Sequence, residues 1–533
     1  MKKALVLLLV IFTIFVTGCK KTEVSLYPVL KYDDHKAGYA FMDKQGEIQI
    51  DSRFDDVLLN FNDAYAIVLA DKKVEIIDKT GTVVLDGIDS VYQIKETQAI
   101  VKRGEKTELV DLTTKEILMS YDYIAFGENG IYAYMDGGKW GYRDLSGEKK
   151  LAPQFDEAFP FGENAAVATK ENKSFIIDKK LNISDAPFTE SYKINEDTIL
   201  AKMDDKQILT DLNGKVINDN LAGDLTEVYG DLYSAFQRVD GVLVKKVFNK
   251  NGKPVSDENF SDVRLLGHGF FAGKLDAGFA LFSEDSGRLT DYKYDYLNSD
   301  NFDKKLDKKI GSITGVRENT AYSINKNGEE KYKVAENAES IILDRDTFIV
   351  QNELNTRYIS PEMKVIAVSP KVEYDGDFRF LTDIENGKNY PFVIHKSAND
   401  ILNNSIKKAV DKITTEENTR FNKKINGDIL YFTLKTKQAE YPFMADINSG
   451  KEVEAGDLFK DPKVMDEIIE EKKAEENIKG DVKLVSFSYD DDFKFVLRSD
   501  KEYFITMDKA ELDRYINVEG SFFKSLYKPV VNK

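Results

Sequence analysis

Residues 138–147 read Gly-Lys-Trp-Gly-Tyr-Arg-Asp-Leu-Ser-Gly, and their last four form a turn motif that recurs along the chain. Asp and Asn side chains accept hydrogen bonds from nearby backbone N–H groups, and Gly readily adopts positive φ. Around the copy that starts at Asp78, Ile76 and Ile77 precede the turn and the apolar residues 83–85 follow it. These residue types favour strands, so each copy of the motif predicts a β-hairpin.

Four copies of the turn Asp-x-x-Gly and five degenerate copies in the same phase follow one another at a nearly constant interval. Between the first residues of successive copies, the steps are 35, 33, 33, 34, 33, 38, 35 and 41 residues. A further strand-like run precedes the hairpin, as at residues 65–69, 98–101 and 165–168, so each period predicts three or four short strands. One such unit cannot bury its apolar face alone, and the units are therefore expected to stack. The nine turns begin at Asp43, Asp78, Asp111, Asp144, Asp178, Asp211, Asn249, Glu284 and Asn325.

The repeats predict a mainly β array over residues 38–372, for which two architectures fit. Radial units would give a β-propeller or a propeller-like closed array, and an open stack of hairpins would give a β-solenoid. The closed array is favoured because no obvious capping segment is found at either end. Against closure, nine or ten units exceed the usual range of about four to eight blades.

The unit at residues 138–161 resembles the WG, or KWG, β-repeat family. The resemblance rests on residues 138–144, Gly147, residues 151–158 and Phe161, and in weaker form it extends over about residues 38–370. The chain has a single tryptophan, so surface tryptophans cannot act as a repeated ligand code. The Trp-Gly pair is therefore interpreted as a packing element with close backbone approach. Other units replace the tryptophan with Tyr39, Val74, Gln207 or Ala321.

The N-terminus has the pattern of an exported lipoprotein. Lys2 and Lys3 are followed by an apolar run at residues 4–16 and then by small residues before Cys19, the only cysteine. That order is typical of a cleaved secretory signal, predicted here at residues 1–18. Residues 16–19 resemble the bacterial lipobox, which implies a lipid on Cys19 and anchoring on the extracytoplasmic face of a cell membrane. Residues 19–37 are predicted to form a tether.

Charge excludes several classes of partner. The formal net charge is −18, and removal of Lys2 and Lys3 with the signal peptide makes it −20. A chain this acidic is poorly suited to nucleic acid or to anionic lipid head groups. Because Cys19 is the only cysteine, no disulfide can form within the chain.

After about residue 370 the pattern changes, and residues 373–533 are predicted to form a separate α+β domain. Apolar residues between 401 and 413 fall on one helical face, and residues 429–434 and 441–447 form a hairpin. Asp461 and Pro462 are expected to open a second helix, with three more strands and a short helix after it.

This region resembles the extracellular domain of RsiV-type anti-sigma factors. The resemblance covers about residues 385–516 and rests on residues 446–451, 457–460 and 503–507, followed by the helical residues 509–512. In that family the module binds lysozyme, so the resemblance implies lysozyme as a candidate partner. The anti-sigma segment and the transmembrane helix of that family are absent from this sequence, so a signalling role does not carry over.

The sequence contains few motifs that are typical of enzymes. No catalytic residue, no metal-binding residue and no cofactor is predicted. The three histidines, His35, His268 and His395, are far apart and have no metal-ligand spacing. The acidic residues 490–492 are interpreted as a hairpin turn. A second acidic group is interpreted as a solvated face, because it lacks the glycine and terminal glutamate of a calcium loop. This group comprises Asp291, Asp295, Asp300 and Asp303.

The predicted function is that of a binding or scaffold lipoprotein, not an enzyme. Its partner would be a protein, with lysozyme as the candidate, or a cell-wall polymer. The alternative is an envelope glycan hydrolase that uses a pair of carboxylates not identified by the sequence.

Overall fold

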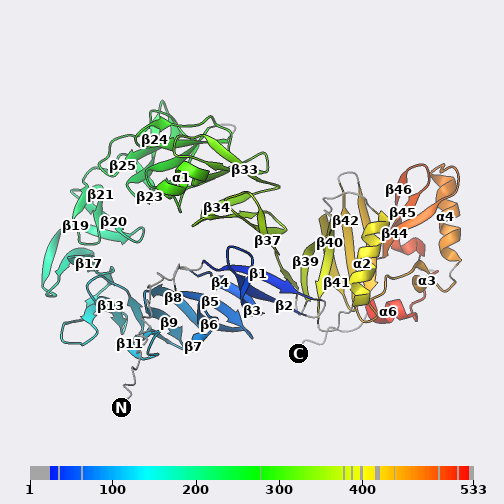
Figure 1. The fold of residues 1–533 in the computed structure, drawn as a ribbon, viewed down its shortest axis with the longest axis horizontal. Coiled ribbons are helices and arrows are strands. Elements are labelled where there is room, and N and C mark those ends of the chain that lie inside the picture. Colours follow the sequence, from blue (N-terminus) through cyan, green and yellow to red (C-terminus); the bar gives the residue numbers. More distant parts are fainter. Residues whose placement is uncertain are drawn as a thin grey trace, which may run out of the picture.

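A computed structural model of the chain describes residues 25–533 apart from the short segments 34–35, 62–63, 276–277, 376–377, 386–387, 396–399, 414–419, 437–438, 462, 490–491, 513–514 and 527–533. Cys19 and the predicted signal peptide lie outside the described residues. Among the described residues, no helix is long and apolar enough to cross a membrane. Most of the chain is antiparallel β-structure, in many small sheets that follow one another along the sequence (Figure 1).

The described part of the repeat region forms nine antiparallel sheets, and most of them have four strands. Sheet by sheet, the strands are β1 (Tyr27–Tyr32), β2 (Ala37–Met42) and β3 (Ile48–Phe54); β4 (Asp56–Leu59), β5 (Tyr65–Ala70), β6 (Lys73–Asp78) and β7 (Val83–Ile88); β8 (Ser90–Lys95), β9 (Gln98–Arg103), β10 (Lys106–Asp111) and β11 (Ile117–Tyr121); β12 (Tyr123–Ala125), β13 (Ile131–Asp136), β14 (Lys139–Asp144) and β15 (Lys150–Phe155); β16 (Glu157–Ala158), β17 (Ala165–Lys170), β18 (Lys173–Asp178), β19 (Ile183–Lys193), β20 (Thr198–Met203), β21 (Lys206–Asp211) and β22 (Val216–Asn218); β23 (Asp224–Tyr229), β24 (Leu232–Val239) and β25 (Val242–Asn249); β26 (Asp262–Gly267), β27 (Phe270–Leu275), β28 (Gly278–Ser283) and β29 (Gly287–Arg288); β30 (Tyr296–Asn298), β31 (Ile313–Arg317), β32 (Thr320–Ile324) and β33 (Glu330–Glu336); and β34 (Ser340–Asp344), β35 (Thr347–Gln351), β36 (Asn355–Ile359) and β37 (Val365–Pro370).

Linking strands pass from one sheet into the next in the first half of the array. Only one residue separates β3 from β4, β7 from β8, β11 from β12, and β15 from β16. In the next unit the strand β19 does not break at all, because it pairs with β18 near its start and with β20 near its end. The repeating unit is therefore a hairpin together with half of each of two linking strands.

Neighbouring sheets bury their apolar faces against each other. Phe41 and Phe54 of the first sheet, for example, pack against Ala66, Val68 and Ile77 of the second. Similar clusters join the following pairs of sheets around the array. One further cluster lies between the two halves of the seven-stranded sheet β16–β22. Stacking of units that cannot fold alone is confirmed by this pattern.

The first and last sheets of the array also contact each other. Tyr27 and Val29 of β1 share a buried cluster with Tyr358 of β36, and the Tyr358 hydroxyl donates a 2.6 Å hydrogen bond to the Pro28 carbonyl. Figure 1 shows the array curving round until β1 lies beside β37. The finer prediction, a closed propeller, remains a prediction.

Close approach requires glycine at several positions of the repeats, among them Gly81 and Gly141. A Cβ atom on Gly81, whose φ is +81°, would lie 2.7 Å from a methyl carbon of Ile50 in the preceding sheet. A Cβ on Gly141, the glycine of the Trp-Gly pair, would lie 2.3 Å from the Leu151 carbonyl oxygen on the neighbouring strand. Real Cβ contacts are not this short, so the prediction of close backbone approach at the Trp-Gly pair is confirmed.

A short helix, α1 (Lys304–Ile310), interrupts the repeat between β30 and β31, and the sequence pattern did not predict it. Asp303 is its N-cap and accepts hydrogen bonds from the Lys305 and Leu306 amides.

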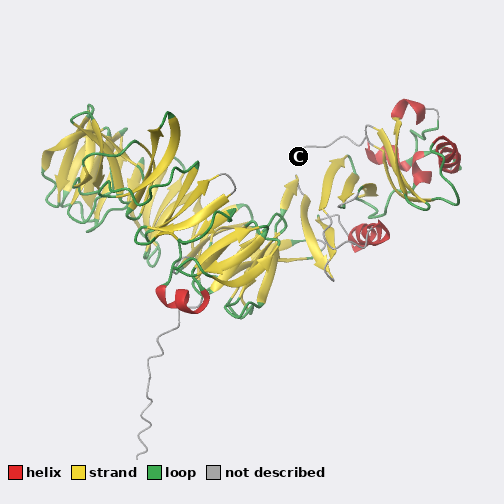
Figure 2. Cartoon of the chain, turned by 90° about the horizontal axis from the view of Figure 1, so that it is seen from above, coloured by secondary structure: helices red, strands yellow, loops and turns green. Residues whose placement is uncertain are grey.

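The C-terminal region, residues 373–526, combines three small sheets with five helices in its described part (Figure 2). The predicted helix and hairpin are found at α2 and at β42–β43. Leu402, Ile406, Ala409 and Val410 are buried as predicted, but Ile401 is 50% exposed. The elements are β38 (Glu373–Asp375), β39 (Phe378–Glu385) and β40 (Lys388–Ile394); α2 (Asp400–Ile413); β41 (Arg420–Asn426), β42 (Ile429–Lys435) and β43 (Glu440–Asp446); α3 (Ala455–Leu458); α4 (Val464–Glu475); β44 (Lys483–Tyr489), β45 (Asp492–Arg498) and β46 (Glu502–Asp508); α5 (Lys509–Leu512); and α6 (Ser521–Leu526).

The helix predicted to open at Asp461 begins later than expected. Its N-cap is Lys463, whose amide donates a 2.9 Å hydrogen bond to the Asp461 carboxylate, and Pro462 lies outside the described residues. The Asp461 side chain therefore accepts a hydrogen bond from a backbone amide at the start of the helix, but Asp461 lies two residues before the N-cap position.

The C-terminal region contacts the first sheet of the array. Arg379 on β39 donates to the Ala37 carbonyl at 2.9 Å and forms a 3.3 Å ion pair with Asp55. The Tyr32 hydroxyl donates to Asp383 at 2.8 Å. An apolar cluster that includes Leu30, Leu381 and Ile394 lies between the two parts. The C-terminal region therefore sits on the same sheet that meets the last sheet of the array.

Candidate binding surface

The aspartate of each turn motif has a structural role. In the turn at residues 78–82, one Asp78 oxygen accepts hydrogen bonds from the Thr80 amide at 2.9 Å and the Thr82 amide at 3.0 Å. Asp43, Asp178 and Asp211 accept from the same two positions of their turns. These carboxylates are used to form the hairpins, as the motif predicts.

A second repeated carboxylate, which the sequence reasoning missed, lies at the bend of the linking strands. Asp89, between β7 and β8, accepts a 2.7 Å hydrogen bond from the Gly104 amide in the turn of the following hairpin. Equivalent bonds from the turn amide to the carboxylate are formed at Asp55, Asp122, Asp156 and Asp295. In Asp122, hydrogen bonds from Lys106 and Gly137 lower the pKa of the carboxyl group. The spacing could have revealed this set, since Asp55, Asp89, Asp122 and Asp156 recur at the period of the turns.

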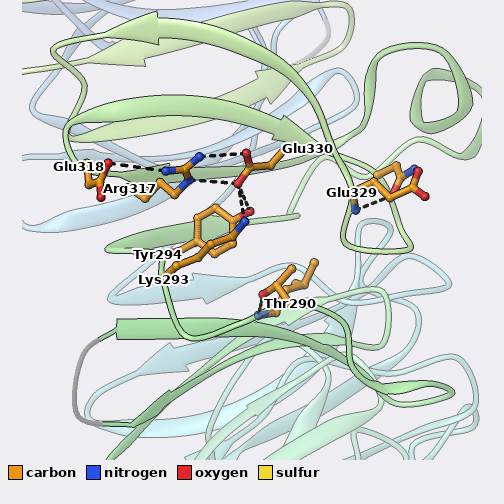
Figure 3. A network of polar contacts seen from close by, with 9 residues as sticks. Thr290, Lys293, Tyr294, Arg317, Glu318, Glu329 and Glu330 are labelled. Atoms are coloured by element: carbon orange, nitrogen blue, oxygen red, sulfur yellow. Dashed lines mark hydrogen bonds and ion pairs between the residues drawn. The ribbon is translucent and has the colours of Figure 1, made fainter.

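Glu330, on β33, is a carboxylate with several hydrogen-bond partners (Figure 3). It accepts hydrogen bonds from Lys293 and Tyr294, both at 2.8 Å, and from Arg317 at 3.1 and 3.3 Å. Burial acts to raise the pKa of Glu330, but the bonds from Arg317, Lys293 and Tyr294 outweigh it and lower the pKa from 4.5 to about 2. Lys293 and Tyr294 precede β30, whereas Arg317 ends β31, so Glu330 joins separate segments of one repeat.

The acidic groups noted in the sequence are separated in the structure. Asp303 caps α1, Asp295 holds a turn amide, and Asp300 accepts a hydrogen bond from the Asn298 side chain. Asp492 starts β45, and Tyr489 pairs with Phe493 across the hairpin, so the interpretation of residues 490–492 as a turn agrees with the pairing. Residues 490–491 themselves lie outside the described residues. No cluster of three or more potential metal ligands exists among the described residues.

The described histidines do not come together. A ring nitrogen of His268 lies 3.3 Å from the Asp300 carbonyl oxygen, and His395 stacks on Phe378 with ring centroids 4.0 Å apart. His35 lies outside the described residues.

Large apolar side chains are exposed on the first strands of several successive sheets. The side chain of Tyr92 on β8 is 46% exposed and that of Tyr123 on β12 is 37% exposed. The Tyr123 ring contacts both Tyr92, with centroids 5.6 Å apart, and the half-buried Trp140 on β14, at 5.4 Å. We call these three residues the aromatic cluster. Further exposed side chains on equivalent strands are Leu58, Leu59, Tyr192 and Tyr229.

The C-terminal region contains a separate cleft of about 500 Å³. It lies against the sheets β41–β43 and β44–β46, and its lining combines Lys424, Glu440 and Lys494 with the exposed ring of Phe504. Its volume lies in the range of small-molecule sites.

A second cavity in this region, of about 970 Å³, contains Glu452 beside Glu454 and Asp457. Burial, with a smaller contribution from Glu454, raises the pKa of Glu452 above its ordinary value. Glu454 and Asp457 are engaged at the start of α3, where they form a reciprocal capping box.

Two segments of the chain, residues 39–73 and 140–173, match the family of WG containing repeats. These two segments are therefore WG-type repeats, and the second of them starts at Trp140 of the aromatic cluster. Among curated proteins, none matches this sequence.

Solved structures resemble the chain only distantly. A putative dipeptidyl aminopeptidase IV from Bacteroides ovatus is 11% identical over 73% of this chain and 66% of that chain, with a TM-score of 0.32. PorZ, a bacterial surface component of the type-IX secretion system of Porphyromonas gingivalis, is 8% identical over 93% of this chain and 80% of that chain, with a TM-score of 0.23. The extracellular domain of a putative hybrid two-component system from B. thetaiotaomicron is 10% identical over 89% and 73%, with a TM-score of 0.20. At such scores, function has to be argued from the chain's own residues.

Proposed function

We propose that the protein is an extracytoplasmic lipoprotein, anchored through Cys19, whose repeat array acts as a binding or scaffold module. The aromatic cluster is the observation that carries this proposal. Many of the array's carboxylates bond backbone amides or lysines, whereas Tyr92 and Tyr123 expose apolar rings to solvent. Exposed rings grouped on a rigid scaffold are typical of binding surfaces.

The contact between the first and last sheets supports a closed, propeller-like array. In a closed array each sheet has two neighbours, so the exposed rings on successive linking strands keep fixed positions relative to one another. This arrangement would suit an extended partner such as a cell-wall polymer.

A protein partner, with lysozyme as the candidate, is proposed for the C-terminal region on the basis of its resemblance to the RsiV module. The cleft against β41–β46, which exposes Phe504 beside lysine and glutamate side chains, supports a site there. An excess of acidic residues in the chain also favours a basic partner such as lysozyme.

Retention assays test both partners. The full chain, immobilised from mild detergent, is expected to retain purified cell-wall sacculi or lysozyme. Alanine at Tyr92 and Tyr123 should reduce retention of sacculi, and alanine at Phe504 should reduce retention of lysozyme. If the wild-type chain retains neither, the binding function is wrong for these partners.

For the alternative function, an envelope glycan hydrolase, one residue is a specific candidate for the general acid. A carboxyl group with a raised pKa inside a cavity is a common feature of a general acid, and Glu452 has both properties. If the chain cleaves peptidoglycan, E452Q should abolish turnover without changing thermal stability. If the wild-type chain shows no turnover of sacculi, this alternative is excluded.

A further inference from the structure

We infer that Tyr92, Tyr123 and Trp140 form a binding site for an uncharged saccharide chain, which rests on the proposed binding function and gives its ligand a chemical class. The site lies on the third and fourth sheets of the array, across the boundary between two repeats.

Each residue of the aromatic cluster lies on a strand, which fixes the position of its backbone. Tyr92 and Tyr123 lie on the strands β8 and β12, which follow the bends at Asp89 and Asp122, and each of these carboxylates bonds the turn of the next hairpin. Trp140 packs on the buried cluster that includes Tyr142 and Phe155. The rings are tilted by 44° between Tyr92 and Tyr123 and by 68° between Tyr123 and Trp140. Several ring faces and edges are thus presented in fixed directions.

Such a surface matches the chemistry of sugars. One side of a pyranose ring carries C–H groups with a partial positive charge, and these stack on the negative face of an aromatic ring. The rim of the same sugar carries hydroxyl groups, which need polar partners at the edge of the site.

The polar groups beside the cluster form neutral pairs. Lys106 and Asp122 form a 2.7 Å ion pair whose side chains are 49% and 33% exposed. Lys139, next to Trp140, forms an ion pair with Asp156, and both of these side chains are also partly exposed. These groups can exchange hydrogen bonds with hydroxyls and bring no net local charge. A polyanion is disfavoured by the acidic chain as a whole, and a basic partner would find the local carboxylates already paired.

Trp140 is the only tryptophan in the chain, so its fluorescence reports on this site alone. We would titrate the full chain, in mild detergent, with chitotetraose and cellotetraose as uncharged probes and with polygalacturonate as an anionic probe. A saturable change in tryptophan emission is expected with at least one uncharged tetrasaccharide and not with the polyanion. The two uncharged probes distinguish an amino-sugar chain from a plain hexose chain.

Substitutions in the aromatic cluster test whether the saccharide binds there. Y92A and Y123A should each weaken binding by about tenfold, because one stacking contact contributes up to about this factor. Y332A removes an exposed tyrosine from a distant sheet and should bind like the wild type. Far-ultraviolet circular dichroism and thermal unfolding must show that the variants are folded, and Y92F and Y123F, which keep the rings, should retain binding.

Three results would overturn the inference. These are no saturable response to either uncharged saccharide, equal binding by wild type, Y92A and Y123A, or a stronger response to the polyanion. If the chain still retains sacculi or lysozyme while the saccharides fail, the proposed binding function survives and only the ligand class is wrong.

Discussion

Replacement of Glu330 by glutamine tests the polar network of Figure 3 through the pH dependence of stability. The carboxylate has a pKa of about 2 in the folded chain against 4.5 ordinarily. That difference corresponds to about 3 kcal/mol at about 1.36 kcal/mol per pKa unit. Because 22% of the side chain is exposed, solvent screening reduces the expected loss in E330Q to about 2 kcal/mol at neutral pH.

The sign of the pH effect follows from the lowered pKa. A carboxyl group whose folded pKa is depressed stabilises the fold above its unfolded pKa, and this contribution is lost as the pH falls toward the folded pKa. The difference in the free energy of unfolding between wild type and E330Q should therefore have its full value above about pH 5. At about pH 3 it should be smaller by about half. Glutamine is the chosen replacement because it keeps the shape of the side chain while it removes the charge and replaces one acceptor oxygen with an NH2 donor.

Urea unfolding followed by Trp140 emission, at several pH values, measures this difference. E148Q, which changes an exposed glutamate in the same array, is the matched control and should unfold like the wild type at every pH. A destabilisation of E330Q that is the same from pH 7 to about pH 3 would refute the reasoning, because it would show that the charge of Glu330 contributes nothing.

Three further changes test other features. G141A should destabilise the array by about 1–3 kcal/mol, because a Cβ would meet the Leu151 carbonyl at 2.3 Å; unchanged urea unfolding would contradict this. Y358F should cost about 1 kcal/mol, since it removes the hydrogen bond to Pro28 that joins the first and last sheets, and hydrogen exchange should rise in β1 and β36 together. C19S should release the protein from the membrane fraction in cells, and if C19S remains in that fraction, the lipid-anchor proposal fails.

The hairpin turns could be predicted from the sequence because their chemistry is local. Asp78 and the glycine three residues later are sufficient to define a turn, and the regular spacing shows that the turn repeats. The apolar face of α2 was equally visible at Leu402, Ile406, Ala409 and Val410. The helix α1 was not predicted, because four of its seven residues are lysines and Ile310 and Leu306 give too short an apolar pattern.

The linking strands and the aromatic cluster depend on contacts that the sequence does not display. An aspartate such as Asp89 between two apolar runs suggests a break, and only the structure shows that a single residue at the bend separates two strands of neighbouring sheets. Tyr92 and Trp140 are 48 positions apart in the sequence, and each contacts Tyr123. The sequence does not display these contacts, so the tryptophan was interpreted from it as a packing residue. That interpretation holds for Gly141, whereas Trp140 also borders an exposed surface.

The contact between β1 and β37 differs from the other joints of the array in how it would carry mechanical load. In the described part of the array, every other pair of neighbouring sheets is also connected along the chain. The first and last sheets are held by side-chain packing, by hydrogen bonds such as that from the Leu30 amide to Ser369, and by the ion pair between Lys44 and Asp346. The proposed lipid anchor lies just before β1 in sequence. If the proposed anchor and the proposed wall polymer pulled on the array from opposite ends, this joint, which has no connecting chain, would be expected to separate at a lower force than the others.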